Sequence, residues 1–109
     1  LAMMSGFILG ALERKIAVII DGFIVSASFL HAYSINPDVI GNCFFSHVSA
    51  EKGHRKMLNT LGVRPILDLD LRLGEGTGAC LAYPILQASV NFLNEMASFS
   101  DAGVSNKND

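Results

Sequence analysis

The sequence predicts an α/β fold in which flanking helices cover a parallel sheet, a three-layer, Rossmann-like arrangement that forms part of a domain. Short apolar runs alternate with longer segments of helical spacing, in the order helix, strand, helix, strand, helix, strand, helix. Each apolar run is followed at once by polar residues. Right-handed crossovers between successive strands are the default in such chains, so the strands are expected to run parallel.

The first predicted elements are a helix over residues 2–13 and a strand over residues 16–20. The helix has apolar side chains at helical spacing, whereas the strand is an unbroken apolar run, mostly of β-branched residues. Such a run is typical of a strand buried on both faces. Asp21 and Gly22 end the strand, and residues 23–33, which carry few charges, are predicted to form the next helix.

The middle of the chain predicts a second strand over residues 39–45 and a more exposed helix over residues 51–61. The polar residues 46–49 follow the strand, and the helix carries an apolar stripe on an otherwise polar surface. Ser49 is expected to cap the start of this helix, and Gly62 is expected to end it.

The last predicted elements are a strand over residues 65–71 and a helix over residues 77–96 that is apolar nearly all round. Pro84 is expected to kink this helix or to mark where its regular part begins. The domain portion is predicted to cover residues 1–105, with a polar tail at residues 106–109.

The composition fits one small domain and argues against some partners. Half of the 109 residues are hydrophobic and 17% are charged. This is apolar for a small soluble chain, so we expect it to pack against something else or to belong to a larger protein. The formal net charge is -2 without a basic run, which gives no support for nucleic-acid binding. The histidine spacing predicts no metal site, and Cys43 and Cys80 are expected to be buried free thiols in a reducing compartment.

The segment over residues 16–35 has about the length and the apolar content of a transmembrane helix. Asp21 argues against a span, since a charged group inside the bilayer costs about 2.5 to 3.5 kcal/mol. A strand, a turn and a helix account for the same residues without that cost. The N-terminus lacks the basic region of a signal peptide, so we expect a cytoplasmic protein without a membrane partner.

Residues 68–79 hold the most distinctive pattern in the chain. A strand end runs into three glycines at alternate positions, and Glu75 lies between the first two. A strand, a glycine turn and a helix bring backbone N–H groups to the carboxyl edge of a sheet, where ligands bind in open α/β folds. The spacing is neither the dinucleotide-binding fingerprint nor a P-loop. Because Glu75 would repel a phosphate, we expect it to face a proton or a cation.

Polar residues follow all three predicted strands. Asp21 follows the first, Ser49 lies in the polar segment after the second, and Arg72 and Glu75 follow the third. The ends of parallel strands lie along one edge of a sheet, so these residues are expected to converge on one crevice. Taken singly, Asp21 could be a turn residue, Ser49 a helix cap, and Arg72 a partner in a surface ion pair.

Three segments at these strand ends resemble one enzyme family. They read Asp-Gly-Phe at residues 21–23, Ser-His-Val-Ser-Ala-Glu-Lys-Gly-His at residues 46–54, and Arg-Leu-Gly-Glu-Gly-Thr-Gly-Ala at residues 72–79. Together with the ending at residues 95–105, they are similar to the C-terminal third of nicotinate-nucleotide–dimethylbenzimidazole phosphoribosyltransferases. The likeness covers nearly the whole chain, and residues 72–79 carry most of its specificity.

The resemblance implies transfer of phosphoribose from nicotinate mononucleotide to 5,6-dimethylbenzimidazole. The products are α-ribazole 5′-phosphate and nicotinate, on the route to the lower ligand of cobalamin. It implies that Glu75 is the general base that takes the azole proton. A carboxylate held beside a bound aromatic ring is kept from water and takes up a proton more readily, which suits a base working near neutral pH. No cofactor or metal is implied, and the complete protein is expected to be a homodimer.

The resemblance also assigns substrate-binding residues around this base. Some are expected near the phosphoribosyl group, one is expected against the benzimidazole ring, and two glycines would let the substrates approach the backbone closely. The residues near the phosphoribosyl group are Asp21, Ser49 and Arg72, the ring contact is Leu73, and the glycines are Gly74 and Gly76.

Family members are longer than this chain and carry, upstream, a second glycine-rich loop with a glutamate and a lysine. The chain is therefore expected to be a fragment or a truncated product that lacks full activity alone. Two other interpretations stay open. A non-catalytic module would dock on another chain through its apolar surface, and a generic α/β nucleotide-binding domain would bind nucleotides tightly without any need for the base.

Overall fold

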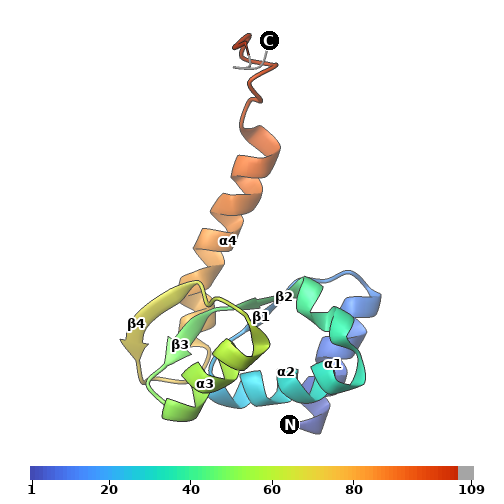
Figure 1. The fold of residues 1–109 in the computed structure, drawn as a ribbon, viewed down its shortest axis with the longest axis vertical. Helices are drawn as coiled ribbons and strands as arrows, with labels where there is room; N and C mark the ends of the chain where they lie inside the picture. Colours follow the sequence, from blue (N-terminus) through green and yellow to red (C-terminus); the bar gives the residue numbers. More distant parts are fainter. Residues whose placement is uncertain (106–109) are drawn as a thin grey trace.

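The computed structural model describes residues 1–105, so the predicted polar tail at residues 106–109 lies outside the described part. The elements follow the predicted order, with an added 3₁₀ helix and with the middle strand divided in two (Figure 1). The helices are α1 (Ala2–Glu13), α2 (Phe23–Ile35), η1 (Pro37–Asn42), α3 (Lys52–Leu61) and α4 (Thr77–Glu95), and the strands are β1 (Val18–Ile20), β2 (Cys43–Phe45), β3 (His47–Ser49) and β4 (Leu67–Leu71).

The strands are parallel, as predicted, but they form two short ladders instead of one continuous sheet. β1 pairs with β2 and places Ile20 opposite Phe45, while β3 pairs with β4. The two ladders join at Ser46, whose backbone N–H donates to the oxygen of Ile20 at 2.9 Å and whose oxygen accepts from Leu67 N–H at 2.9 Å. The chain therefore changes partner at Ser46, and the α/β class with parallel strands is confirmed.

The predicted strand over residues 39–45 is wrong in its first half. Pro37 has no backbone N–H to donate to a ladder, and Asn36 Oδ1 accepts a hydrogen bond from Asp38 N–H at 3.0 Å. These two residues start the 3₁₀ helix η1, which delays the strand to Cys43. Conversely, the polar residues expected to follow the strand form β3.

The helix ends are close to those predicted, with two differences. Gly62, at φ 67°, ends α3 as expected, but Glu51 occupies the N-cap position predicted for Ser49. Ser49 lies two residues earlier, where its Oγ accepts a hydrogen bond from Glu51 N–H at 3.3 Å. Pro84 lies inside α4, which runs unbroken through it, so this proline does not mark where the regular helix begins (Figure 1).

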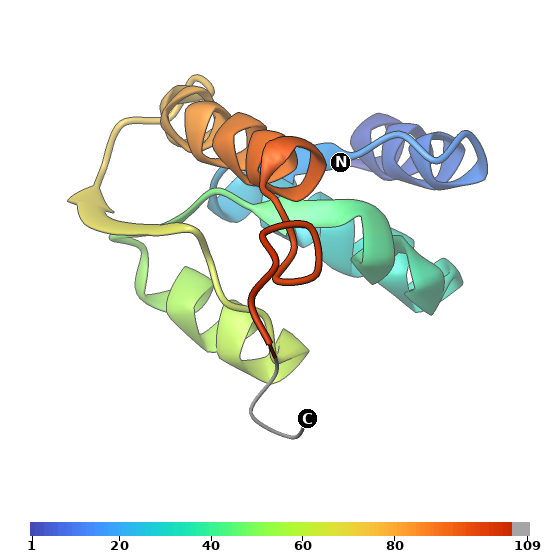
Figure 2. The same ribbon diagram turned by 90° about the horizontal axis from the view of Figure 1, so that it is seen from above.

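The apolar core lies where α1, α2 and the strands meet. Its largest side chains are almost fully buried, and the Phe29 and Phe45 rings meet edge to face at 4.9 Å between centroids. In Figure 2, α4 lies above the strands and α3 lies below them, so helices flank the strands on both faces. Cys43 is buried, and burial raises the pKa of its thiol to about 11. Cys80 is exposed, so its predicted burial is wrong.

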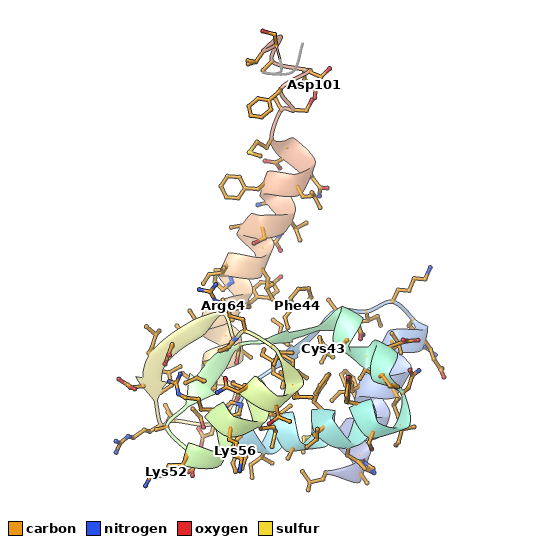
Figure 3. The ribbon with its side chains drawn as sticks, viewed as in Figure 1. Cys43, Phe44, Lys52, Lys56, Arg64 and Asp101 are labelled. Carbon is orange, nitrogen blue, oxygen red and sulfur yellow. The ribbon has the colours of Figure 1, made fainter. Side chains whose placement is uncertain are left out.

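The second half of α4 projects from the body of the molecule (Figure 1). The radius of gyration is 16.8 Å, whereas a compact chain of this length would have about 13 Å. The side chains along the projecting part stand clear of the body (Figure 3), and Phe92, Leu93 and Met96 are exposed. Within residues 1–105, no helix combines the length and the apolar content needed to cross a bilayer.

Candidate functional site

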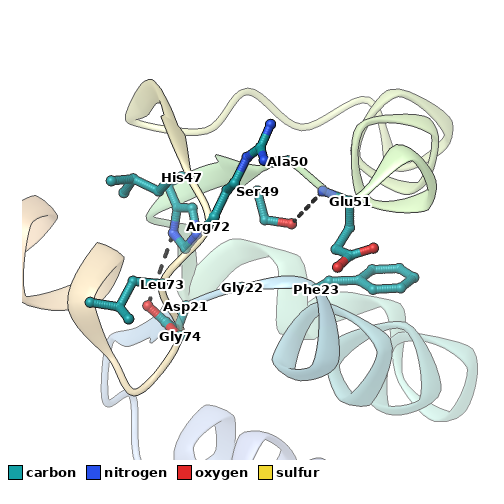
Figure 4. A pocket seen from close by; sticks show the side chains of 11 residues that line it. Asp21, Gly22, Phe23, His47, Ser49, Ala50, Glu51, Arg72, Leu73 and Gly74 are labelled. Carbon is teal, nitrogen blue, oxygen red and sulfur yellow. Dashed lines mark hydrogen bonds and ion pairs between the residues drawn. The ribbon is translucent and has the colours of Figure 1, made fainter.

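A cavity of about 430 Å³ lies at the carboxyl ends of β1, β3 and β4 (Figure 4). Its size is within the range of small-molecule sites, about 300 to 1,000 Å³. The structure therefore confirms that the three strand ends converge on one cavity. The lining residues are Asp21, Gly22, Phe23, His47, Ser49, Ala50, Glu51, Leu71, Arg72, Leu73 and Gly74.

Asp21 connects the first strand end to the start of α4. Its two carboxylate oxygens accept hydrogen bonds from Gly76 N–H at 3.2 Å and from Ala79 N–H at 2.9 Å. These are among the first N–H groups of α4, which have no partner inside the helix. The residue at the N-cap of α4, Gly76, has no side chain to satisfy them. Asp21 therefore caps α4 from a distant part of the chain.

His47 lies buried behind Asp21. Its Nδ1 is 4.0 Å from Asp21 Oδ1 and 2.9 Å from Ser46 Oγ. The Ser46 hydroxyl donates to the backbone oxygen of Asp21 at 2.8 Å, so it must accept from His47, and Nδ1 carries a proton. The imidazole also lies directly against Gly78, where a Cβ atom would overlap the ring. Residue 78 must therefore be a glycine while the ring keeps this place.

A second buried histidine, His54, supports Ser49 at the end of β3. Its Nδ1 accepts a hydrogen bond from Ser49 N–H at 2.9 Å, and its Nε2 lies 2.9 Å from Ser26 Oγ. An imidazole that accepts at Nδ1 carries its proton on Nε2 and is neutral. Burial, and secondarily the nearby His47, lower the pKa of His54. This neutral ring fixes the backbone of Ser49 at the edge of the cavity.

The loop between β4 and α4 contributes Arg72, Leu73 and Gly74 to the cavity lining. Arg72 and Leu73 are exposed, and Leu73 exposes 65% of its surface. Glu75 is also exposed and lies outside the lining, as does Gly76. Five of the six residues predicted to bind substrate therefore line the cavity: Asp21, Ser49, Arg72, Leu73 and Gly74. The predicted base, Glu75, lies beside the cavity.

Glu75 has an unusual backbone. Its φ is 64° and that of Gly76 is 82°, so two consecutive residues occupy the left-handed region. Glycine adopts this region freely, whereas a residue with a Cβ pays about 1 to 2 kcal/mol. The loop is closed by Thr77 Oγ1, which donates to the oxygen of Gly74 at 2.9 Å. The conformation of Glu75 is imposed by its surroundings, as is common at functional sites.

Sequence reasoning missed several residues of the cavity and its support. Phe23 packs beside the cavity close to Gly53, and Glu51 and Ala50 line it at the start of α3. His47 lies in a segment that the sequence already singles out, and its neighbour in space, Gly78, is the third glycine of the loop. The contact between the two could not be inferred from either segment alone. Within residues 1–105, no group of three acidic, histidine or cysteine side chains is placed to hold a metal ion.

The fold and the cavity define the class: an α/β protein with a small-molecule site at the carboxyl ends of parallel strands. A sequence profile of a family described as "Phosphoribosyltransferase" matches residues 1–104. The chain belongs to this family, and the relatives that it resembles are named nicotinate-nucleotide–dimethylbenzimidazole phosphoribosyltransferases.

Relatives in sequence and in structure agree on this family. The nicotinate-nucleotide–dimethylbenzimidazole phosphoribosyltransferase of Aromatoleum aromaticum is 52% identical over 107 residues, which are 98% of this chain and 31% of that protein. The enzyme of the same name from Dechloromonas aromatica is 55% identical, with the same coverage. The crystal structure of the Thermus thermophilus enzyme matches with a TM-score of 0.86 and 47% identity, over 94% of this chain and 31% of that one.

The chain spans somewhat less than a third of the length of these relatives. The 0.86 TM-score shows that the body seen here has the same fold in a solved member of the family.

Proposed function

We propose that this chain takes part in phosphoribosyl transfer from nicotinate mononucleotide to 5,6-dimethylbenzimidazole, as part of a glycosyltransferase of cobalamin synthesis. The observation that carries the proposal is the cavity at three strand ends in a chain that belongs to this family. The products would be α-ribazole 5′-phosphate and nicotinate. The two small molecules are the proposed partners, in a cytoplasmic enzyme that needs no cofactor.

In this proposal Glu75 is the general base. Its carboxylate takes the N–H proton of the azole while the other ring nitrogen forms a bond to C1′ of the ribose. The C1′–N bond to nicotinate breaks, and nicotinate leaves with the bonding electron pair. Proton transfer by a positioned group contributes about 10²- to 10⁴-fold to a rate, so holding the two substrates in place must supply much of the rest.

The position of Glu75 beside the cavity suits such a base. The side chain is exposed in the structure, so a bound aromatic ring would have to remove it from water. Leu73, two residues earlier, is apolar and exposed and borders the cavity. We propose that the benzimidazole ring covers Leu73 and thereby desolvates Glu75, a step that occurs only when the acceptor is bound.

In this proposal the remaining residues predicted to bind substrate serve the phosphoribosyl group and the approach of the substrates to the loop. Arg72 supplies a positive charge at the rim, which suits a phosphate. Ser49 supplies a hydroxyl at the end of β3, and Asp21 stands opposite at the end of β1. Gly74 and Gly76 carry no side chain, so the substrates can approach the loop backbone closely.

We further propose that the complete protein is a homodimer. The support is the projecting half of α4, along which the large apolar side chains of Phe92, Leu93 and Met96 are exposed, since neighbouring exposed apolar side chains are common at interaction surfaces. The same surface favours a second hypothesis, a non-catalytic module that docks on another chain. In that case the cavity would bind neither substrate.

Substitution of Glu75 tests the proposal. Glu75→Gln keeps the size and polarity of the side chain but removes the proton acceptor. Turnover of nicotinate mononucleotide with dimethylbenzimidazole is expected to fall about 10²- to 10⁴-fold, while calorimetry finds binding of nicotinate mononucleotide nearly unchanged. The exposed Glu13, at the end of α1, gives the matched control Glu13→Gln. Near-normal turnover in Glu75→Gln would remove the base assignment.

A further inference from the structure

We propose that Asp21 is a positioning residue, which acts on the reaction by holding the loop that carries Glu75. The inference rests on the proposed role of Glu75 as the base. It assigns Asp21 a contribution separate from contact with the phosphoribosyl group: the carboxylate sets the backbone of residues 75–79 before any substrate is bound.

The first support is the way in which Asp21 is bonded. Each of its two carboxylate oxygens accepts one backbone N–H, at Gly76 and at Ala79. These amides follow Glu75 by one and four residues and lie 55 and 58 residues from Asp21 in the sequence. A carboxylate at a helix N-terminus also interacts favourably with the helix dipole. The carboxylate is largely buried, with 16% of the side chain exposed, so water competes little for these bonds.

The second support is the backbone that these bonds hold. Glu75 and Gly76 both have positive φ, and a glutamate adopts this conformation only where its surroundings impose it. Two of the constraints lie within the loop: Thr77 Oγ1 bonds the oxygen of Gly74, and Cys80 N–H bonds the oxygen of Gly76, each at 2.9 Å. Asp21 supplies the constraint on the N–H side of Gly76. Without it, the peptide that follows Glu75 is free to turn.

The third support is that Asp21 is itself held from behind. The Ser46 hydroxyl donates to its backbone oxygen, and His47 donates to Ser46. The His47 ring fills the space between Asp21 and Gly78, with no room for a Cβ at residue 78. A carboxylate that served only as a ligand for substrate would not need a buried imidazole and a side-chain-free helix turn behind it. The assembly joins the end of β1 and the junction between β2 and β3 to the first turn of α4.

Kinetic constants distinguish a positioning role of Asp21 from direct binding of the substrate. A ligand of the phosphoribosyl group contributes in the ground state, so its loss would raise KM for nicotinate mononucleotide. A positioning residue for the base contributes when the proton moves, so its loss lowers kcat and leaves KM nearly unchanged. Its effect should also disappear once the base itself has been removed.

The two hydrogen bonds from the Gly76 and Ala79 amides to the Asp21 carboxylate form a clamp on the loop. Amide hydrogen exchange in the full chain tests this clamp without reference to catalysis. In Asp21→Asn, one of the two acceptors becomes an NH₂ donor that faces a backbone N–H. The Gly76 and Ala79 amides are expected to exchange at least about tenfold faster, and the strong intraresidue amide–Hα NOE of positive φ should weaken at Glu75. The Leu67 amide, which bonds Ser46 in the sheet, should be unchanged. Unchanged exchange at both loop amides in a folded Asp21→Asn chain would overturn the proposal.

Asp68→Asn is the matched control for this experiment. Asp68 also loses a charge in the substitution, but its side chain is 54% exposed and pairs with Arg55 on the surface. If Asp21→Asn does not fold, the wild-type chain answers instead: NMR scalar couplings across the hydrogen bonds should connect the Gly76 and Ala79 amide nitrogens with the Asp21 carboxyl carbon. The absence of both couplings in the folded chain would equally contradict the clamp.

Kinetics connects the clamp to the proposed function. Asp21→Asn is expected to lower kcat at least about tenfold, in addition to any rise in KM for nicotinate mononucleotide, and to lower kcat no further when added to Glu75→Gln. A rise in KM with kcat unchanged, or additive losses in kcat, would show a substrate ligand alone and overturn the positioning role. If Glu75→Gln itself keeps full turnover, the proposed base fails, whereas the exchange measurement still decides whether Asp21 holds the loop.

Discussion

The cavity edge and the projecting half of α4 differ in how their side chains are satisfied. At the cavity edge, the buried polar groups find partners inside this chain: Asp21 on two loop amides, His47 on Ser46, and His54 on Ser26 and Ser49. Along the second half of α4, large apolar side chains are exposed to solvent. The difference separates a region whose polar groups are satisfied within residues 1–105 from a region whose apolar side chains are left uncovered there.

This contrast predicts opposite consequences for substitutions in the two regions. Changes at the cavity edge should alter the free energy of unfolding or the pH dependence of the fold, because the groups there depend on one another. Changes along the outer half of α4 should alter association and leave the fold almost as stable as before.

The largest change in stability is expected from Gly78→Ala. A Cβ at this position overlaps the buried His47 ring, so the ring must move, and overpacking of this kind costs about 1 to 3 kcal/mol. Gly6 in α1 provides the control, since a Cβ there meets nothing within 4 Å. Gly6→Ala should stabilise the chain by about 0.5 to 1 kcal/mol. Urea unfolding of the two variants should shift in opposite directions, and equal shifts would contradict the packing of His47 on Gly78.

A smaller effect is expected from acid acting on His54. The pKa of this buried imidazole is lowered from its ordinary value of 6.5. Just below pH 6.5, His54 is therefore protonated in the unfolded chain but still neutral in the folded chain. Stability from His54 is therefore present above about pH 6.5 and is lost as the pH falls below it, at up to about 1.4 kcal/mol per pH unit.

His54→Asn isolates this contribution. The amide can still accept from Ser49 N–H but does not titrate. Unfolding free energies measured across the acid range should fall less steeply in the variant than in the wild type. If the two slopes are the same below pH 6.5, His54 is not the neutral, buried ring that its hydrogen bonds indicate.

The smallest change in stability is expected in the projecting half of α4. Phe92→Ser together with Leu93→Ser removes two exposed apolar side chains, so the free energy of unfolding should change by no more than about 0.5 kcal/mol for each substitution. Association measured by sedimentation should weaken markedly. Asn91→Ser, on the same turn, should change neither property. A strong loss of stability in the double variant would show that this surface is covered within the chain.

Much of the fold could be predicted from the sequence, because its signals are local. The helix over residues 2–13 has the predicted bounds, and Gly62 ends α3 as expected. The errors have local physical causes as well. Pro37 and its Asn36 cap turn the first half of an apolar run into the 3₁₀ helix η1, and the polar residues after that run still complete a ladder with β4.

The candidate site was predictable only in part. The convergence of Asp21, Ser49 and Arg72 follows from the order of parallel strands, and the structure brings them to one cavity. The bonds from Asp21 to the loop could not be predicted, since they join residues 55 and 58 positions apart. The exposure of Glu75 was also not foreseen. Sequence patterns describe a residue within its own segment, whereas the Asp21 hydrogen bonds and the exposure of Glu75 depend on how two distant segments pack together.

Product analysis shows whether this chain carries a phosphoribosyltransferase site. The chain is incubated with nicotinate mononucleotide and 5,6-dimethylbenzimidazole, and the mixture is separated by chromatography and identified by mass. We predict α-ribazole 5′-phosphate and nicotinate in equal amounts, at a rate below that of a full-length relative, and a rate about 10²- to 10⁴-fold lower again from Glu75→Gln. Two results would rule out such a site: nicotinate release that does not depend on dimethylbenzimidazole, or the absence of both products together with no binding of either substrate.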